Sequence, residues 1–393
     1  MRNFVGEFAQ KIQPSGIRKF FDIVGEMPDA ISLGVGEPDF VTPWGIRDSA
    51  IRSINKGYTQ YTSNKGIPIL RDLISKYLKE RFDLSYSREE ILVTVGASEA
   101  IDLSLRATIN SGDGILVPSP SYVSYSPIIE LCGGKAIEVP CKEENGFKVT
   151  YDCLKKAVTK ETKAIILPFP NNPTGAILER EYLEEVARFV LEYDLLVITD
   201  EIYAELTYGS EKHVSIASID KMIERTIYIN GFSKAFAMTG WRIGYLCCKN
   251  VDIMSAILKI HQYAIMCAPT FSQYGAMYAL EEGLQDDFSI VKEMHDEYDK
   301  RRRYLVSAFN EMGLTCFEPK GAFYVFPNVF EKTGLTGEQF AERLLKEEKV
   351  AVVPGNAFGE SGKYNVRCAY AYSMAKLTEA IKRIGRFVEK VSK

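Results

Sequence analysis

Short apolar runs alternate with amphipathic segments between about residue 65 and residue 280 of the chain. The apolar runs are rich in β-branched residues and are bounded by turn residues, a pattern typical of buried strands. The predicted strands are residues 91–95, 114–118, 135–140, 163–170, 195–200, 226–231 and 243–248. The segments between them, such as residues 178–194, place apolar residues at helical spacing. This alternation predicts an α/β domain with a mostly parallel sheet and helices on both faces.

The C-terminal part of the chain shows a different pattern. A long, charged amphipathic helix is predicted over residues 286–313, a second helix near 336–347, and a final helix at the end of the chain. Between the last two helices lie two short apolar segments, residues 350–358 and 364–371. Few strands with helices alongside predict a smaller α+β domain.

The length of 393 residues is more than a single core usually supports, so two or three domains are expected. Residues 1–46 have no obvious βαβ partner of their own and are expected to join the C-terminal part. We therefore predict a large cofactor-binding domain over residues 47–283 and a small domain built from residues 1–46 and 284–393.

Composition narrows the functional classes. The net charge of −4 is spread along the chain, which argues against a nucleic-acid surface. The N-terminus lacks the uninterrupted apolar core of a signal peptide, and no apolar run is long enough to span a bilayer. The eight cysteines form no C-x-x-C pair, and the three histidines are scattered, so neither disulfides nor a metal site is expected. A soluble, cytoplasmic protein with reduced thiols is predicted.

In open α/β sheets, ligands bind beyond the carboxyl ends of the strands, so the residues that follow each predicted strand are candidate site residues. "GASEA", which follows the strand at 91–95, is a glycine turn that opens a helix whose N-terminus would suit a phosphate. "SPSYVSYSP", after the next strand, places Tyr122 and Tyr125 at the sheet edge, where they could stack on a flat ring. An ordinary turn and ordinary core packing would explain each segment taken alone.

Two further strand ends carry polar residues. Asn172 lies in the turn "NNPTG", where Pro173 and Gly175 would hold it in a fixed pose. Asp200 ends a strand that is otherwise wholly apolar, and a carboxylate at that depth is costly unless it is paired with a cation. That cation would be either a structural arginine or a ligand.

The segment "NGFSKAFAMTGWRIGY" (230–245) places Lys234 among apolar residues with no acidic residue nearby, and the nearest charge is another cation, Arg242. Burial and a like charge should lower the pKa of this lysine. A neutral lysine is a nucleophile toward aldehydes and forms Schiff bases. Ser233 and Arg242 also supply donors for a phosphate.

Together these segments describe one ligand: flat, phosphorylated, bearing an aldehyde, and with a ring nitrogen that needs a carboxylate. Pyridoxal 5'-phosphate meets all four requirements. A dinucleotide does not, because "GASEAI" lacks the second and third glycines of the dinucleotide fingerprint.

Several motifs resemble those of the class I aminotransferases, which are pyridoxal-phosphate enzymes of fold type I. They are "ISLGVGEPDF", "YTQYTSNKGIPILRDLI", "NNPTG", "DEIYAEL", "GFSKAFAMTGWRIGY", "KGAFYVFP", "VAVVPGNAFG" and "NVRCAYA". They follow the family's order over nearly the whole chain. The sequence is most similar to the subgroup that contains aspartate, aromatic and N-acetyl-diaminopimelate aminotransferases.

The resemblance implies a role for each matching residue around the cofactor ring. Lys234 would form the Schiff base with the aldehyde, and Asp200 would bind the protonated ring nitrogen. Tyr203 and Asn172 would hydrogen-bond the ring hydroxylate, and Tyr122 would stack on the ring in place of the Trp or Phe of many relatives.

The phosphate and the substrate involve other residues. The resemblance implies that Ala97, Ser98, Ser233 and Arg242 hold the phosphate, and that Tyr61 reaches the phosphate of a second subunit in a homodimer. Arg367 would clamp the substrate α-carboxylate bidentately, with help from Asn172 and the backbone at Gly36.

The implied reaction is ping-pong transfer of an amino group from an L-amino acid to a 2-oxo acid such as 2-oxoglutarate. Family members fold the segment that corresponds to "PSGIRKFF" over the substrate, and its apolar Ile17 and Phe20 favour an aromatic donor. The ordinary core stripe of a helix would explain the same two residues, and aspartate and N-acetyl-diaminopimelate donors stay open. A β-lyase of the same fold would share every residue named above. A non-catalytic regulator would need an added DNA-binding helix pair, and a NAD-dependent oxidoreductase would need the glycine fingerprint.

Overall fold

The computed structural model describes residues 2–12, 27, 29–210 and 212–392. Its centre is a seven-stranded sheet with the strand order β2-β8-β7-β6-β5-β3-β4. The strands are β2 (Ile91–Thr94), β3 (Gly114–Ser119), β4 (Lys135–Pro140), β5 (Thr162–Leu167), β6 (Leu196–Asp200), β7 (Thr226–Gly231) and β8 (Gly244–Cys247). Neighbouring strands are parallel except for β8, which is antiparallel to β2 and β7. All seven predicted strands and the predicted α/β fold are confirmed.

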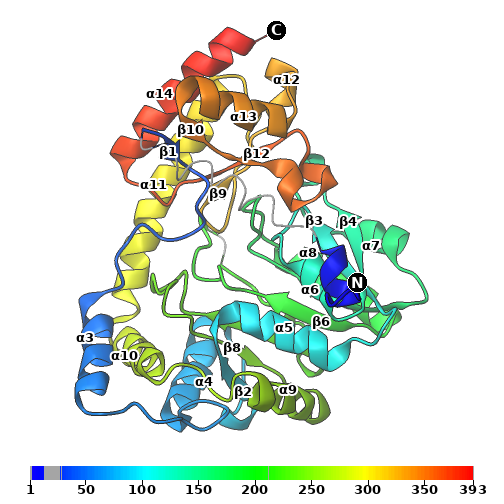
Figure 1. Cartoon of the computed structure of the whole chain (residues 1–393), viewed down its shortest axis with the longest axis vertical. Helices are drawn as coiled ribbons and strands as arrows, with labels where there is room; N and C mark the ends of the chain where they lie inside the picture. Colours follow the sequence, from blue (N-terminus) through cyan, green and yellow to red (C-terminus); the bar gives the residue numbers. More distant parts are fainter. Residues whose placement is uncertain (1, 13–26, 28, 211, 393) are drawn as a thin grey trace.

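Helices cover both faces of this sheet (Figure 1). They are α3 (Trp44–Asn55), α4 (Pro68–Phe82), α5 (Gly96–Thr108), α6 (Tyr125–Leu131), α7 (Tyr151–Ala157), α8 (Arg180–Glu192), α9 (Val251–Ala264) and α10 (Thr270–Asp286). Successive strand residues point to opposite faces, so Ile198 packs with residues of α5, α6 and α9 while Val197 packs with residues of α8. This arrangement explains why the strands are apolar throughout: neither face meets water.

The C-terminal part forms a second assembly of short strands and helices. Its elements are α11 (Ser289–Glu311), β9 (Tyr324–Val325), α12 (Phe330–Thr333), α13 (Gly337–Glu348), β10 (Val350–Ala351), β11 (Val353–Pro354), β12 (Val366–Ala369) and α14 (Met374–Val391). Strands β11, β12 and β9 make an antiparallel sheet in that order. Figure 1 shows the long helix α11 running from this assembly toward the helices beside the large sheet.

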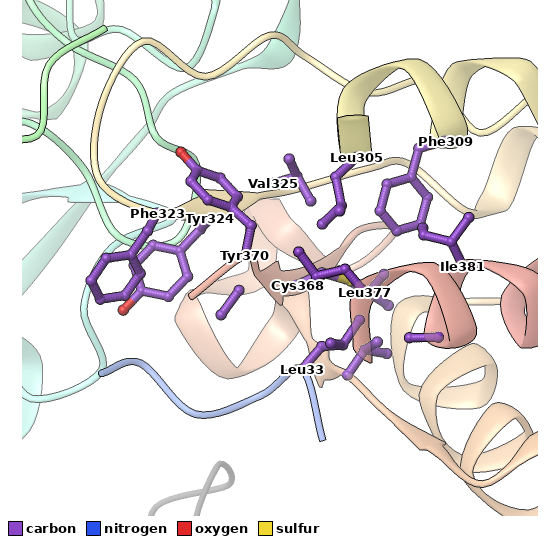
Figure 2. Packing of buried hydrophobic residues seen from close by; sticks show 14 of the residues in the cluster. Leu33, Leu305, Phe309, Phe323, Tyr324, Val325, Cys368, Tyr370, Leu377 and Ile381 are labelled. Atoms are coloured by element: carbon purple, nitrogen blue, oxygen red, sulfur yellow. The ribbon is translucent and has the colours of Figure 1, made fainter. Parts of the chain in front are cut away.

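The N-terminal segment joins the C-terminal part through β1 (Ile31–Ser32). This strand pairs in parallel with β10, with Ile31 opposite Val350. Leu33 follows β1 and is buried in the same cluster as Cys368 and Leu377 (Figure 2). The division of the chain into a large domain and a small domain built from both termini stays a prediction. By contrast, α1 (Glu7–Lys11) lies beside α6, against the large sheet (Figure 1).

The predicted helix over residues 286–313 begins later than expected. Helix α10 extends to Asp286, and α11 starts only at Ser289, because Asp287 and Phe288 both take left-handed backbone angles with φ of 54°. The Phe288 ring is buried and packs against Gly283, where an added Cβ would lie 2.4 Å from the ring. A side-chain contact therefore ends one helix and starts the next, which hydrophobic spacing cannot show.

Within the described part of the chain, every helix is too short or too polar to cross a membrane. All eight cysteines are free.

Candidate active site

A cavity of about 700 Å³ opens at the carboxyl ends of the central strands. It lies where the large sheet meets the C-terminal assembly, since Asp200 ends β6, Lys234 follows β7, and Arg367 belongs to β12. The structure brings together there all of the predicted site residues except Tyr61: Gly36, Ala97, Ser98, Tyr122, Asn172, Asp200, Tyr203, Ser233, Lys234, Arg242 and Arg367.

The side chain of Lys234 is partly buried in this cavity, and its Nζ donates a hydrogen bond of 2.7 Å to the backbone oxygen of Gly36. Burial of the ammonium group lowers the pKa of Lys234 to about 8; Glu37 opposes this shift, and Arg367 and Arg242 add to it. The amine is therefore partly neutral near neutral pH, whereas an ordinary lysine is almost wholly charged.

Asp200 is the buried carboxylate of the site. Its Oδ2 accepts a hydrogen bond of 2.8 Å from the Tyr125 hydroxyl, and its Oδ1 accepts the N–H of Ile202 at 3.3 Å. Burial raises the pKa of Asp200 to about 6, and these two hydrogen bonds oppose the rise. Among the described residues no cation forms a salt bridge with it, so the structural arginine is not its partner.

Tyr125 was expected at the sheet edge with Tyr122, as a ring that could stack on a ligand, but its hydroxyl instead binds the Asp200 carboxylate. It is the first residue of α6, its hydroxyl donates to Asp200, and both Tyr122 and Tyr125 line the cavity. Both tyrosines of "SPSYVSYSP" are visible in the sequence, but the sequence pattern does not show which of them contacts the Asp200 carboxylate.

Tyr203 pairs with a second tyrosine that the sequence left without a role. The two hydroxyl oxygens of Tyr203 and Tyr324 lie 2.8 Å apart, and burial raises the pKa of Tyr203. Tyr324 also restricts which residue type can occupy position 36, because a Cβ added to Gly36 would lie 2.4 Å from the Tyr324 hydroxyl. Only glycine fits at this position without displacing the tyrosine.

Arg367 is held in a fixed pose from several sides. Its Nη1 donates to Asn172 Oδ1 at 2.9 Å, and its Nη2 donates to the backbone oxygen of Gly34. The guanidinium carbon lies 4.5 Å from the ring centre of Tyr324 and 4.8 Å from that of Phe358. The Nε atom is buried and has no hydrogen-bond partner within the described residues. An oriented, desolvated guanidinium with donors to spare suits a carboxylate ligand.

The opposite end of the cavity suits a phosphate. Helix α5 begins at Gly96, and Ala97 and Ser98 of its first turn line the cavity. Gly96 has a φ of 73°, and an added Cβ would lie 2.6 Å from Nη2 of Arg242. Helix N–H groups, a serine hydroxyl and a guanidinium thus converge on one region, which is the donor set that phosphates require.

Three predicted features lie elsewhere. Tyr61 does not line the cavity and is 79% exposed in this single chain, so its role toward a second subunit stays a prediction. Ile17 and Phe20 lie outside the described residues. Among the described residues, no group of three or more His, Cys, Asp or Glu side chains is placed to hold a metal ion.

The α/β fold thus carries a cavity that combines donors of the kind that bind phosphate with a lysine of lowered pKa. Residues 28–384 match the family model described as aminotransferase class I and II. The chain therefore belongs to the class I and II aminotransferases, as the motifs predicted, and it is an aminotransferase enzyme.

Individual relatives agree with this assignment. The chain is 47% identical to an aspartate aminotransferase of Pyrococcus abyssi (strain GE5 / Orsay), over 95% of each chain. It is 43% identical to aromatic-amino-acid aminotransferase 2 of Thermococcus litoralis, over 97% of each chain. The crystal structure of an aromatic aminotransferase from Pyrococcus horikoshii OT3 is 45% identical, with a TM-score of 0.90 over 94% of this chain and 99% of that one. The fold is thus shared closely, while the named substrates differ.

Proposed function

We propose that this protein is a pyridoxal-phosphate-dependent aminotransferase that moves the amino group of an L-amino acid, with aromatic donors favoured, to a 2-oxo acid such as 2-oxoglutarate. One observation carries the proposal. A single cavity holds a partly buried lysine with a pKa of about 8, a buried carboxylate without a salt bridge, and an oriented arginine. Each of these groups answers one requirement of amino transfer.

The residues present fit the cofactor. The N-terminus of α5, with Ser98, Ser233 and Arg242, would hold the phosphate. Asp200 would pair with the protonated ring nitrogen, and this explains why its carboxylate faces the cavity without a protein cation. Tyr122 would stack on the ring.

When bound, pyridoxal phosphate supplies an aldehyde that condenses with amines and a ring that accepts the electrons left by a departing α-proton. Lys234 contributes its neutral Nζ, first as the nucleophile and then as the base that carries the proton away from the substrate α-carbon. Tyr203 and Asn172 would hold the ring hydroxylate. Asp200 would keep a proton on the ring nitrogen, because a carboxylate with a pKa of about 6 is mostly charged at neutral pH.

Arg367 fixes the substrate for both halves of the reaction. Amino acids and 2-oxo acids share an α-carboxylate, so one clamp serves both in a ping-pong cycle. Asn172 and the backbone oxygen of Gly34 hold the guanidinium plane, which presets the direction in which the carboxylate binds. A preset direction keeps the α-carbon within reach of Lys234.

The donor preference follows from the charges that line the cavity. Its cations among the described residues are Lys234, Arg242 and Arg367, and each has a role in the steps above. Much of the remaining lining is apolar or aromatic, and includes Ile101, Tyr122, Val123, Pro168, Pro170, Ile202 and Tyr324. No cation of this set is left for a second carboxylate, which favours an aromatic side chain over that of aspartate.

A homodimer is part of the proposal. Tyr61 and Tyr263 are 79% and 94% exposed in the single chain. Tyr263 lies in α9, and the adjacent Gln262 donates a hydrogen bond of 3.2 Å to Asn64 Oδ1 in the segment that contains Tyr61. Large exposed aromatic residues that gather in one region are typical of a protein interface. Sedimentation of the purified protein tests this, and a fully active monomer would contradict it.

Absorbance and chemical trapping test the core of the proposal. The protein loaded with pyridoxal phosphate should be yellow, and borohydride should fix the cofactor irreversibly to Lys234, as shown by peptide mass mapping. Phenylalanine, tyrosine and aspartate should then be compared as donors to 2-oxoglutarate. A strong preference for aspartate would refute the donor assignment. Turnover that releases ammonia when no 2-oxo acid acceptor is added would indicate a β-lyase instead.

A further inference from the structure

Glu99 lies in the first turn of α5 but is not among the residues that line the cavity. Each of its two carboxylate oxygens has a hydrogen-bond partner that does not line the cavity. Oε2 accepts the backbone N–H of Val95, the residue that precedes the helix, and Oε1 lies 2.7 Å from Nδ1 of His261. The Glu99 side chain is only 10% exposed.

His261 ties this carboxylate to a neighbouring helix. It lies in the last turn of α9, its side chain is fully buried, and α9 packs beside α5 (Figure 1). Its backbone oxygen also accepts the N–H groups of Ile265 and Met266, which fixes the end of α9 at this place. The Glu99 side chain is thereby held in one orientation from two sides.

This contact decides which N–H groups the helix end presents. The first N–H groups of a helix have no partner within it. Glu99 accepts the N–H of Val95, and the N–H groups that follow belong to Gly96 and to Ala97 and Ser98, of which the last two line the cavity. The turn is also confined from the strand side, because a Cβ on Gly244 would lie 2.7 Å from the Ala97 nitrogen.

We propose that Glu99, held by His261, is a positioning residue for the cofactor phosphate: it fixes the turn at Val95 so that the N–H groups of Gly96, Ala97 and Ser98 point at the phosphate. This inference rests on the proposed function, since it needs pyridoxal phosphate as the ligand. It also explains how a carboxylate is tolerated next to an anion site: both of its oxygens are turned to donors outside the cavity.

Helix stability alone is the competing explanation, and the chain contains a matched case. In α13, Gln339 accepts the N–H of Thr336 at the corresponding helix end. This contact involves no residue that lines the cavity. Both side chains stabilise a helix, but only Glu99 does so at a helix end that faces the predicted phosphate.

The test compares pyridoxal phosphate with pyridoxal, which has the same aldehyde and no phosphate. Dissociation constants of both for the cofactor-free enzyme are measured by the absorbance of the Lys234-bound form, in the wild type, Glu99→Ala, Glu99→Gln and Gln339→Ala. For Glu99→Ala we expect roughly tenfold weaker binding of pyridoxal phosphate with unchanged binding of pyridoxal. Glu99→Gln keeps an acceptor for Val95 and should stay within about threefold of the wild type for both ligands. Gln339→Ala should leave both constants unchanged.

The outcomes separate the two proposals. If Glu99→Ala weakens the binding of pyridoxal phosphate and of pyridoxal equally, or weakens neither, the positioning role is wrong although the proposed function stands. If Glu99→Gln binds pyridoxal phosphate as weakly as Glu99→Ala, the acceptor at Val95 is not the cause and the inference fails. If the wild type binds neither ligand at Lys234, the proposed function itself fails first.

Discussion

The cofactor half and the substrate half of the site are built in different ways. The groups that would hold pyridoxal phosphate come from the ends of the large sheet: the β2–α5 turn, the end of β6, and the segment between β7 and β8. The substrate clamp joins Arg367 of the small sheet to Asn172 and to Gly34, which lie 195 and 333 residues away in sequence.

This difference has a physical consequence. One continuous hydrogen-bonded sheet fixes the cofactor groups relative to one another. The clamp instead spans the sheet of β9, β11 and β12, the loop after β5 and the N-terminal segment, so its geometry depends on how these parts pack together. Changes in one half should therefore act on cofactor retention, and changes in the other half on substrate affinity.

The largest expected effect is at the residue that serves both halves. Lys234→Ala removes the nucleophile and the base together, and transamination should fall by at least ~10⁴-fold. Borohydride should no longer attach the cofactor to the protein. Steady-state turnover and mass spectrometry check both points, and a variant with near-normal turnover would refute the assigned role.

The next largest effect isolates the substrate half. Arg367→Lys keeps the charge but loses the planar pair of donors, so kcat/KM should fall about 100-fold, mainly through KM. The absorbance of the bound cofactor should not change. Arg386→Lys is the control, since Arg386 pairs with Glu348 at the surface and lies outside the cavity. Loss of cofactor from Arg367→Lys would contradict the proposed division of the site into a cofactor half and a substrate half.

The pH dependence of cofactor loading probes the cofactor half alone. Burial lowers the pKa of Lys234 to about 8, and only the neutral amine attacks an aldehyde. The loading rate of the cofactor-free enzyme should therefore be constant above pH 8 and fall about tenfold for each pH unit below it. Stopped-flow absorbance measures the rate. A rate that still rises well above pH 8 would mean that the amine keeps an ordinary lysine pKa.

The smallest effect concerns Tyr125. Its hydrogen bond lowers the pKa of Asp200, so Tyr125→Phe should raise that pKa above about 6. A larger fraction of Asp200 is then protonated near neutral pH, and kcat/KM should fall roughly threefold, with its acid limb shifted to higher pH. Tyr151→Phe removes a similar tyrosine–carboxylate bond, to Glu192 at the surface, and should leave the pH profile unchanged.

Much of this site was predictable because strand ends are predictable. Continuous apolar runs marked each strand, and parallel strands bring their carboxyl ends to one edge of the sheet. Asp200 and Lys234 were therefore expected together before any side chain was placed. The glycine turn "GASEA" likewise predicted a helix N-terminus at this edge, with free N–H groups that can bind an anion.

The side-chain pairs were not predictable in this way. Tyr125 with Asp200, Tyr203 with Tyr324, and Glu99 with His261 join residues 75, 121 and 162 positions apart. Their contacts depend on how helices pack on the sheet and how the small sheet docks, and no local pattern records this.

Taken alone, the order of apolar and polar residues determined the strands, the alternation of helices with them, and the type of chemistry at the strand ends, because burial on both sheet faces imposes a visible composition. Tertiary packing alone decided which side chains meet: the orientation of Arg367, the partner of Asp200, the turn at Phe288 and the position of Glu99 at the N-terminus of α5. These depend on distances between elements, which are set by the close packing of the whole interior.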